Sequence, residues 1–261
     1  MFGSSTIMTG LVAAPGRHPA VPLAWTGLLL GLLALLLGAI SGLGHRAGLW
    51  NFTTGFAVLG VAVLAGLAGL IASAIALVRL RRQRHRPPLR VAALGGALGM
   101  LVVGLPANQL HLGATLPRIH DITTDSADPP AFVAIAPLRA DAPNPPGYAG
   151  EQVARLQLAA YPQIVPHFYR ANRHVVFNEA VEVVRRRGWS LVASEPEAGR
   201  IEASAVSRWF GFVDDMVIRV ADSANGTRVD VRSKSRVGLS DLGANAKRVE
   251  SFLSEMDTQL N

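Results

Sequence analysis

The chain has 261 residues, a formal net charge of +7, 50% hydrophobic residues and no cysteine, which excludes a disulfide framework, a thiolate metal site and a cysteine nucleophile. Residues 1–116 hold eight arginines and no acidic residue, whereas residues 117–261 hold 17 basic and 18 acidic residues. The positive excess therefore belongs to the apolar half, where it indicates membrane topology rather than nucleic-acid binding.

Three apolar runs predict a membrane anchor over residues 1–116. The first two, at about 23–43 and 56–78, are long enough to cross a bilayer core of roughly 30 Å. The third, 91–105, is short by itself and reaches a spanning length only when it continues across Pro106 to about residue 112. The runs contain no ionisable side chain, which argues against a transporter and favours an anchor.

The arginines predict the orientation of this anchor. Six of them lie at 79–90, between the second and third runs, and only one lies in the connection at 44–55. Short loops rich in Lys and Arg stay in the cytoplasm. We therefore expect a multi-pass protein of the bacterial inner membrane, with the N-terminus, which carries Arg17, in the cytoplasm and residues 117–261 in the periplasm. A cleaved signal sequence is the alternative for the first run, and its length favours retention.

Small residues recur four apart in the runs, for example at Gly27 and Gly31 and at Gly95 and Gly99. This spacing lets helix backbones approach closely. It has two interpretations, a homo-oligomer interface or close packing within one chain. The second is favoured because the runs are rich in Gly and Ala throughout.

Residues 117–261 predict a separate soluble α+β domain. The proline-rich stretch 117–150 predicts an extended arm across the domain surface. Helical periodicity marks 150–161, 174–187 and the segment from 242 onward. Alternation marks strands at 189–194, 200–209, 215–220 and 229–237, with a hairpin at Asn225-Gly226. We expect an antiparallel sheet of about four strands with helices on one face.

Five motifs of this half resemble those of the domain of unknown function 1499 family. They are RIHDITTDSADPPAF, NPPGYAG, AAYPQIVP, GRIEASAVSRWFGFVDDMVIRV and VDVRSKSRVGLSDLGANAKRV, and together they run along nearly all of residues 117–261. The three preceding spans also resemble bacterial members of that family. The resemblance implies the fold, the domain boundary and membrane attachment, and it implies no activity and no catalytic residue.

The sequence gives little evidence for catalytic or metal-binding residues. Asp214 and Asp215 are neighbours on a predicted strand and should point to opposite faces. The stretch 238–243, GLSDLG, departs from the G-x-S-x-G pattern of serine hydrolases, and the histidines show no ligand spacing. His120 and Asp121 are expected in a solvated turn, with a role as base or ligand as the alternative. We therefore expect no metal and no cofactor.

Charged residues are expected to share the sheet face that the helices leave open. They are Glu202, Arg208, Asp215, Arg219, Asp230, Arg232, Lys234 and Arg236. One interpretation is a solvated ladder of opposite charges, in which each pair contributes about 0.2–1 kcal/mol. The other is a polar binding surface. The ladder is favoured because such ladders are common on one-sided sheets.

The corner between the last strand and the last helix is the candidate site. Arg232 and Arg236 should lie on one face of the strand, and Ser240 or Asp241 should cap the helix. With Asn245 and Arg248 on the first turns of that helix, these six residues could surround a carboxylate or phosphate. The favoured alternative is a structural latch, an ion pair of Asp241 or Asp230 with Arg232 or Arg236.

Three functions remain open. The first is a binding or interaction module of the cell envelope, the second an enzyme acting on a small anionic or lipid-derived substrate, and the third a structural partner of another membrane protein. We expect the first, with the lipid bilayer and an envelope protein or anionic ligand as partners. A deep pocket with convergent polar groups would favour the enzyme.

Overall fold

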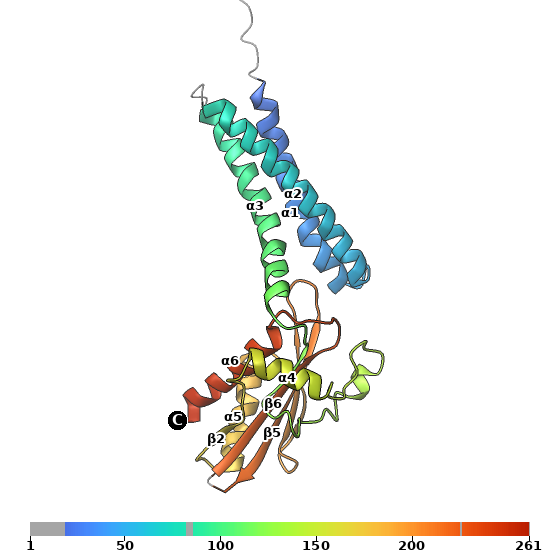
Figure 1. The fold of residues 1–261 in the computed structure, drawn as a ribbon, viewed down its shortest axis with the longest axis vertical. Helices are drawn as coiled ribbons and strands as arrows, with labels where there is room; N and C mark the ends of the chain where they lie inside the picture. Colours follow the sequence, from blue (N-terminus) through green and yellow to red (C-terminus); the bar gives the residue numbers. More distant parts are fainter. Residues whose placement is uncertain (1–18, 82–85, 225, 261) are drawn as a thin grey trace, which may run out of the picture. The chain divides into compact units, whose positions relative to one another are not determined.

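The computed structural model describes residues 19–81, 86–224 and 226–260, and Figure 1 shows its helices and strands. The helices are α1 Ala20–Arg46, α2 Phe52–Arg81, α3 Arg86–Thr115, α4 Glu151–Ala160, α5 Arg173–Arg186 and α6 Ala244–Leu260, with a 3₁₀ turn η1 at Pro137–Arg139. The strands are β1 Asp121–Thr123, β2 His167–Tyr169, β3 Ser190–Glu195, β4 Arg200–Val206, β5 Val213–Ser223 and β6 Gly226–Ser235.

The chain divides into two compact units. The first comprises the residues up to Ile40 together with Ala57–Leu105, and the second comprises Ser41–Phe56 together with Pro106–Asn261. The turn between α1 and α2 and the last part of α3 thus group with the folded domain. The boundary predicted between residues 116 and 117 marks where the chain is expected to leave the membrane, which the contacts within each unit do not test. It stays a prediction.

The three N-terminal helices α1, α2 and α3 are each long and apolar enough to cross a membrane. Each is longer than its apolar run, because the polar residues at its ends continue the helix. The third helix continues through Pro106 to Thr115, so the short apolar run gains the length that spanning requires. Of the arginines that predict the orientation, Arg17, Arg82 and Arg84 lie outside the described residues.

The small residues of the first unit serve packing within the chain. A methyl group added at Gly95 would lie 2.6 Å from the Leu28 nitrogen, and one added at Gly99 would lie 2.6 Å from the Gly66 oxygen. Contacts this short leave space only for hydrogen at the two glycines. The interpretation as packing within one chain therefore accounts for these glycines without a second copy.

The domain is built on an antiparallel sheet of six strands in the order β1-β6-β5-β4-β3, with β2 also paired to β6. The predicted count of about four was wrong, because β1 and β2 are three residues each and too short to show a period. Both pair with the outer edge of β6. Ser223 pairs with Gly226 at the end of the predicted hairpin, whereas Asn225 lies outside the described residues.

The two long domain helices α5 and α6 lie on one face of the sheet (Figure 1). Because side chains alternate along a strand, the apolar residues of the central strands point toward these two helices. Ile201, Met216 and Val231 are examples, and all three are fully buried. Apolar stripes on both helices meet these side chains, and Trp189 stacks on Phe252 at a centroid distance of 6.1 Å. The opposite face of the sheet therefore carries the polar members of each strand.

Candidate functional site

The arm, defined as residues 124–150, covers the polar face of the sheet, which we call the arm-side face. Glu202, Asp215 and Asp230 on this face are fully buried, and Arg232 and Lys234 are nearly so. The predicted solvated ladder was therefore wrong, since these charges lie beneath the arm rather than in water. The charged residues that lie on the strands do share one face, as predicted. Arg208 is not one of them, because it lies in the turn after β4.

Asp215 on β5 anchors the first cluster of charges. Its carboxylate accepts hydrogen bonds from Arg236 Nε and Nη2 at 2.8 and 2.9 Å, from Arg139 Nη1 at 3.0 Å and from Ser204 Oγ at 2.6 Å. Arg139 belongs to the arm and is fully buried. Its two terminal nitrogens also donate to the backbone oxygens of Lys234, Ser235 and Asn144, whereas its buried Nε has no hydrogen-bond partner in the described part of the chain. Asp215 therefore ties two strands to the arm.

Asp121 on β1 anchors the neighbouring cluster and is fully buried. Arg232 binds it through Nε and Nη2, both at 2.9 Å, and Lys234 Nζ lies 3.0 Å away. The solvated turn predicted for this residue was wrong, because Asp121 pairs with β6. Burial lowers the pKa of Lys234 and outweighs the attraction of Asp121, which raises it.

The two clusters together contain four cations and two carboxylates, namely Arg139, Arg232, Lys234 and Arg236 with Asp121 and Asp215. Oxygens of the arm backbone accept the remaining hydrogen bonds: Arg232 donates to Pro130 and Pro146, Lys234 to Gly147 and Arg236 to Leu138. The Phe132 ring lies 4.9 Å from the Arg232 guanidinium. These four cations, of which Arg236 is partly exposed, thus hold the arm on the sheet.

Glu202 on β4 holds the middle of the arm. Its Oε1 accepts hydrogen bonds from the backbone nitrogens of Val133 and Ala134 at 2.9 and 3.0 Å, and its Oε2 accepts one from Ile135 at 2.8 Å. Three successive amides around one carboxylate form a nest, a concave arrangement that favours anions. The nest of this chain is therefore filled by a side chain of its own sheet.

We expect Glu202→Gln to loosen the arm, because an amide offers one acceptor oxygen and turns an N–H₂ group toward the other amides. Loss of charged acceptors for buried donors should cost about 1–3 kcal/mol. Hydrogen exchange should accelerate at residues 133–135. Glu195→Gln is the matched control, since Glu195 is on the neighbouring strand and half-exposed. Unchanged exchange in Glu202→Gln would contradict this role of the carboxylate.

A third group of charges lies toward the start of β6. Asp230 accepts hydrogen bonds from Arg219 at 3.0 Å and from Arg228 at 2.9 Å, and both arginines also bind Asp125 of the arm. Arg219 further donates to Asp128 at 2.7 Å. These residues fix the first part of the arm, as the two clusters fix its later part.

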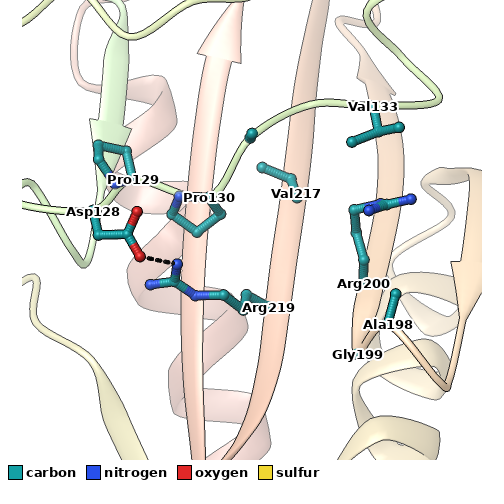
Figure 2. Close-up of a pocket in the computed structure, with 10 residues that line it drawn as sticks. Asp128, Pro129, Pro130, Val133, Ala198, Gly199, Arg200, Val217 and Arg219 are labelled. Atoms are coloured by element: carbon teal, nitrogen blue, oxygen red, sulfur yellow. Dashed lines mark hydrogen bonds and ion pairs between the residues drawn. The ribbon is translucent and has the colours of Figure 1, made fainter.

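A pocket of about 230 Å³ opens on the arm-side face between the arm and the turn before β4 (Figure 2). Its lining residues are Asp128, Pro129, Pro130, Ala131, Val133, Ala198, Gly199, Arg200, Val217 and Arg219. Arg200 and Arg219 stand directly opposite one another on β4 and β5, an arrangement that is unfavourable for like charges. In Figure 2 Arg219 turns toward Asp128 and Arg200 toward Val133, which leaves Val217 between them.

Arg200 makes fewer hydrogen bonds than Arg219, the other arginine of the pocket lining. Its Nη2 donates to Glu195 at 2.6 Å. Its Nε lies 3.1 Å from Glu202 Oε1, yet among the described residues no acceptor lies in line with this N–H. Buried donors without an acceptor are rare in folded proteins. The Nε itself is closed off from solvent, so a ligand in the pocket would meet the exposed part of the Arg200 side chain beside an apolar floor.

The structure separates the six residues of the predicted corner site. Arg232 and Arg236 point to the arm-side face, where Asp121 and Asp215 bind them in place of the expected Asp230 or Asp241. Alternation on β6 instead turns Ser233 toward the helices, where it binds Asn245 Oδ1 at 2.6 Å. The two arginines therefore lie on one side of the sheet and Asn245 lies on the other.

The remaining corner residues bind one another on the helix side. Asp241 caps α6 by accepting from the backbone nitrogens of Gly243 and Asn245 at 2.8 and 2.9 Å, and Ser240 Oγ accepts from Leu242. Arg248 binds Asp214 at 2.7 Å. This geometry puts a carboxylate of the chain where the predicted anion would bind, and binding of an external anion at this corner stays a prediction.

Sequence reasoning missed Arg139, the fully buried cation of the arm. A lone arginine in the apolar and proline-rich stretch AIAPLRADAPN is the signal that could have drawn attention to it. Metal binding gains no support from the structure, since no group of three His, Asp or Glu side chains with suitable spacing occurs in the described part of the chain.

Comparison with known proteins gives one family. The family model described as "Protein of unknown function (DUF1499)" matches residues 121–256, just over half of the chain. The match begins at β1 and ends within α6, so it contains every strand of the sheet and the whole arm. A search of curated proteins found no match.

Proposed function

The chain belongs to the DUF1499 family, and on that premise we propose that it is a membrane-anchored binding module of the bacterial cell envelope. Its domain would work on the periplasmic side and bind a partner or ligand in the pocket of Figure 2. The three apolar helices support membrane attachment. The arginine-rich connection at 79–90 supports the orientation.

The main support for this proposal is the difference between the residues that line the pocket and the buried charges around it. The buried carboxylates of the arm-side face each bind two or more donors, so their hydrogen-bonding capacity holds the arm in place. Arg200 lines the pocket with 24% of its side chain exposed, and its hydrogen bond to Glu195 occupies Nη2 at one side of the guanidinium. A carboxylate or phosphate oxygen is the partner that a guanidinium prefers.

The floor and walls of the pocket suggest the rest of the ligand. Val217 is buried beneath it, and Pro129, Pro130 and Ala131 of the arm form one side. An anionic group attached to a small apolar body would therefore match both the guanidinium and the floor. An acidic side chain on an extended segment of an envelope protein has this chemistry, and so does a small free acid.

Native mass spectrometry of the full chain, extracted from its own membranes in detergent, tests this function. Ala131→Trp should fill the pocket and abolish the bound species, since Ala131 is an exposed lining residue. Ala127→Trp, at an exposed arm residue away from the pocket lining, is the matched control and should keep it. Arg200→Ala should release an anionic species. A wild-type protein without any bound species, or one that Ala131→Trp leaves unchanged, would refute the proposal.

A further inference from the structure

Two loops of the domain lie at the same end of the sheet. The first is Gly238–Gly243, which follows the end of β6, and the second is the turn 207–212 between β4 and β5. Asp214 at the start of β5 pairs with Ser235 at the end of β6, so the two loops emerge side by side. Each carries an exposed apolar side chain, Leu239 with 78% and Trp209 with 38% of its surface accessible.

The first loop packs on the end of α3. Leu242 lies 3.4 Å from the position that a methyl group at Gly113 would take, and Asp241 N donates to the Ile119 oxygen at 3.1 Å. A bilayer core of roughly 30 Å is crossed by about 20 helical residues. Counted from Val91, where the third apolar run begins, such a span ends near Leu110. Gly113 is within one helical turn of that point, so this count would put it at the level of the lipid headgroups.

The second loop packs on the turn between α1 and α2. Trp209 lies against Gly42 and leaves no space there for a side chain. Phe210 lies 4.9 Å from Phe56 and stacks on Phe212 at 5.4 Å. Counted from Leu23, a span of about 20 residues ends near Gly42. Both loops therefore contact the chain where its own spans leave the bilayer core, by contacts that lie within the second unit.

The charges around these loops suit a lipid surface. Arg46, Arg118 and Arg208 are exposed, and the segments 41–56, 106–118 and 207–212 contain no Asp or Glu. The loop Gly238–Gly243 contains one acidic residue, Asp241, whose carboxylate is bound to the backbone nitrogens of Gly243 and Asn245. Arg46 Nη1 also donates to the Arg208 oxygen at 2.6 Å, which joins two of these segments. Phosphate groups of lipids attract arginine, and tryptophan is enriched at the interface between bilayer and water.

We propose that this end of the domain is a bilayer-contacting surface, in which Leu239 and Trp209 enter the headgroup region of the membrane that the chain itself spans. The continuity of both loops with the span ends identifies the lipid bilayer as the occupant. The surface is distinct from the pocket of Figure 2, so it stands whether or not the pocket binds a ligand.

Site-directed labelling tests the surface, and the absence of native cysteine makes it direct. Leu239→Cys carries an environment-sensitive fluorophore in the full chain, with one chain per nanodisc of phosphatidylcholine and phosphatidylglycerol. We expect blue-shifted emission, and quenching by lipids spin-labelled near the headgroup that is several-fold stronger than at the control. Because only one chain is present, a second copy cannot produce this result.

Phe168→Cys is the matched control. Phe168 is 62% exposed on β2, which pairs with the first residues of β6, whereas Leu239 follows its last residues. Ten strand residues separate these ends by about 30 Å. Equal quenching at the two positions, or a blue shift at position 239 without quenching by the lipid label, would overturn the proposal. The second result would assign the surface to a protein segment instead.

Discussion

Asp215→Asn is expected to lower the free energy of unfolding by about 3–5 kcal/mol, the usual effect of removing one partner from a buried ion pair. Asp215 is the carboxylate that Arg139 and Arg236 share, and Arg139 is fully buried. Asparagine keeps the shape of the side chain but removes the charge. The substitution would therefore leave two neighbouring guanidinium groups without the anion between them.

Urea unfolding of the full chain in detergent, followed by tryptophan fluorescence, measures this loss. Asp128→Asn is the control, because Asp128 is 82% exposed and pairs with Arg219 at the rim of the pocket. It should change the stability by less than about 1 kcal/mol, as exposed pairs do. Similar stabilities of the two variants would show that Asp215 does not hold the arm. Arg139→Met combined with Asp215→Asn should recover part of the loss, since an apolar side chain needs no counterion.

Alkaline phosphatase fused after Asn261 is expected to be active, because the enzyme folds only outside the cytoplasm. The prediction depends on the six arginines at 79–90 and on a third crossing. The structure supplies a helix of sufficient length in α3, which continues across Pro106 as far as Thr115. Whether the fused phosphatase is active therefore depends on two features, the arginines between α2 and α3 and the crossing of the membrane by α3.

Two further fusions serve as controls for the topology. A phosphatase fused after Arg81, in the arginine-rich connection, should be silent, and one fused after Ala47, between α1 and α2, should be active. A reporter that is active only in the cytoplasm should give the opposite pattern at all three positions. If that reporter is active after Asn261 while the phosphatase is silent, the domain lies in the cytoplasm and the proposed periplasmic role is wrong.

The longer helices and strands could be predicted because each buries one face, which gives its apolar residues a regular spacing in the sequence. Alternating residues such as Ile201 and Ala203 revealed β4, and the stripe on 174–187 revealed α5. Gly188 follows that helix with a φ of +66°, as expected of a glycine at a helix end. β1 and β2 gave no such signal, since three residues are less than two periods of a strand.

The candidate site was less predictable for a different physical reason. A sequence shows that Arg232 and Lys234 share a strand face, but it does not show what covers that face. Here the cover is an irregular arm, whose contribution is largely backbone oxygens and nitrogens. Every residue has a backbone oxygen, and every residue except proline has a backbone N–H, so these contacts leave little trace in the composition. Charges that would suit a solvated face therefore proved to be buried.

The bond between Asp121 and Arg232 joins residues 111 positions apart in the sequence. Within the domain β1 and the arm are synthesised first, and β6, which supplies Arg232 and Lys234 and leads directly into Arg236, is among the last segments. Long-range pairing of this kind slows folding and leaves intermediates exposed. Until β6 has been synthesised, Arg139 and the arm lack the sheet face on which they pack. The first part of the domain thus depends on the last quarter for the surface on which it packs, and a chain truncated before β6 should be more susceptible to proteolysis than the full chain.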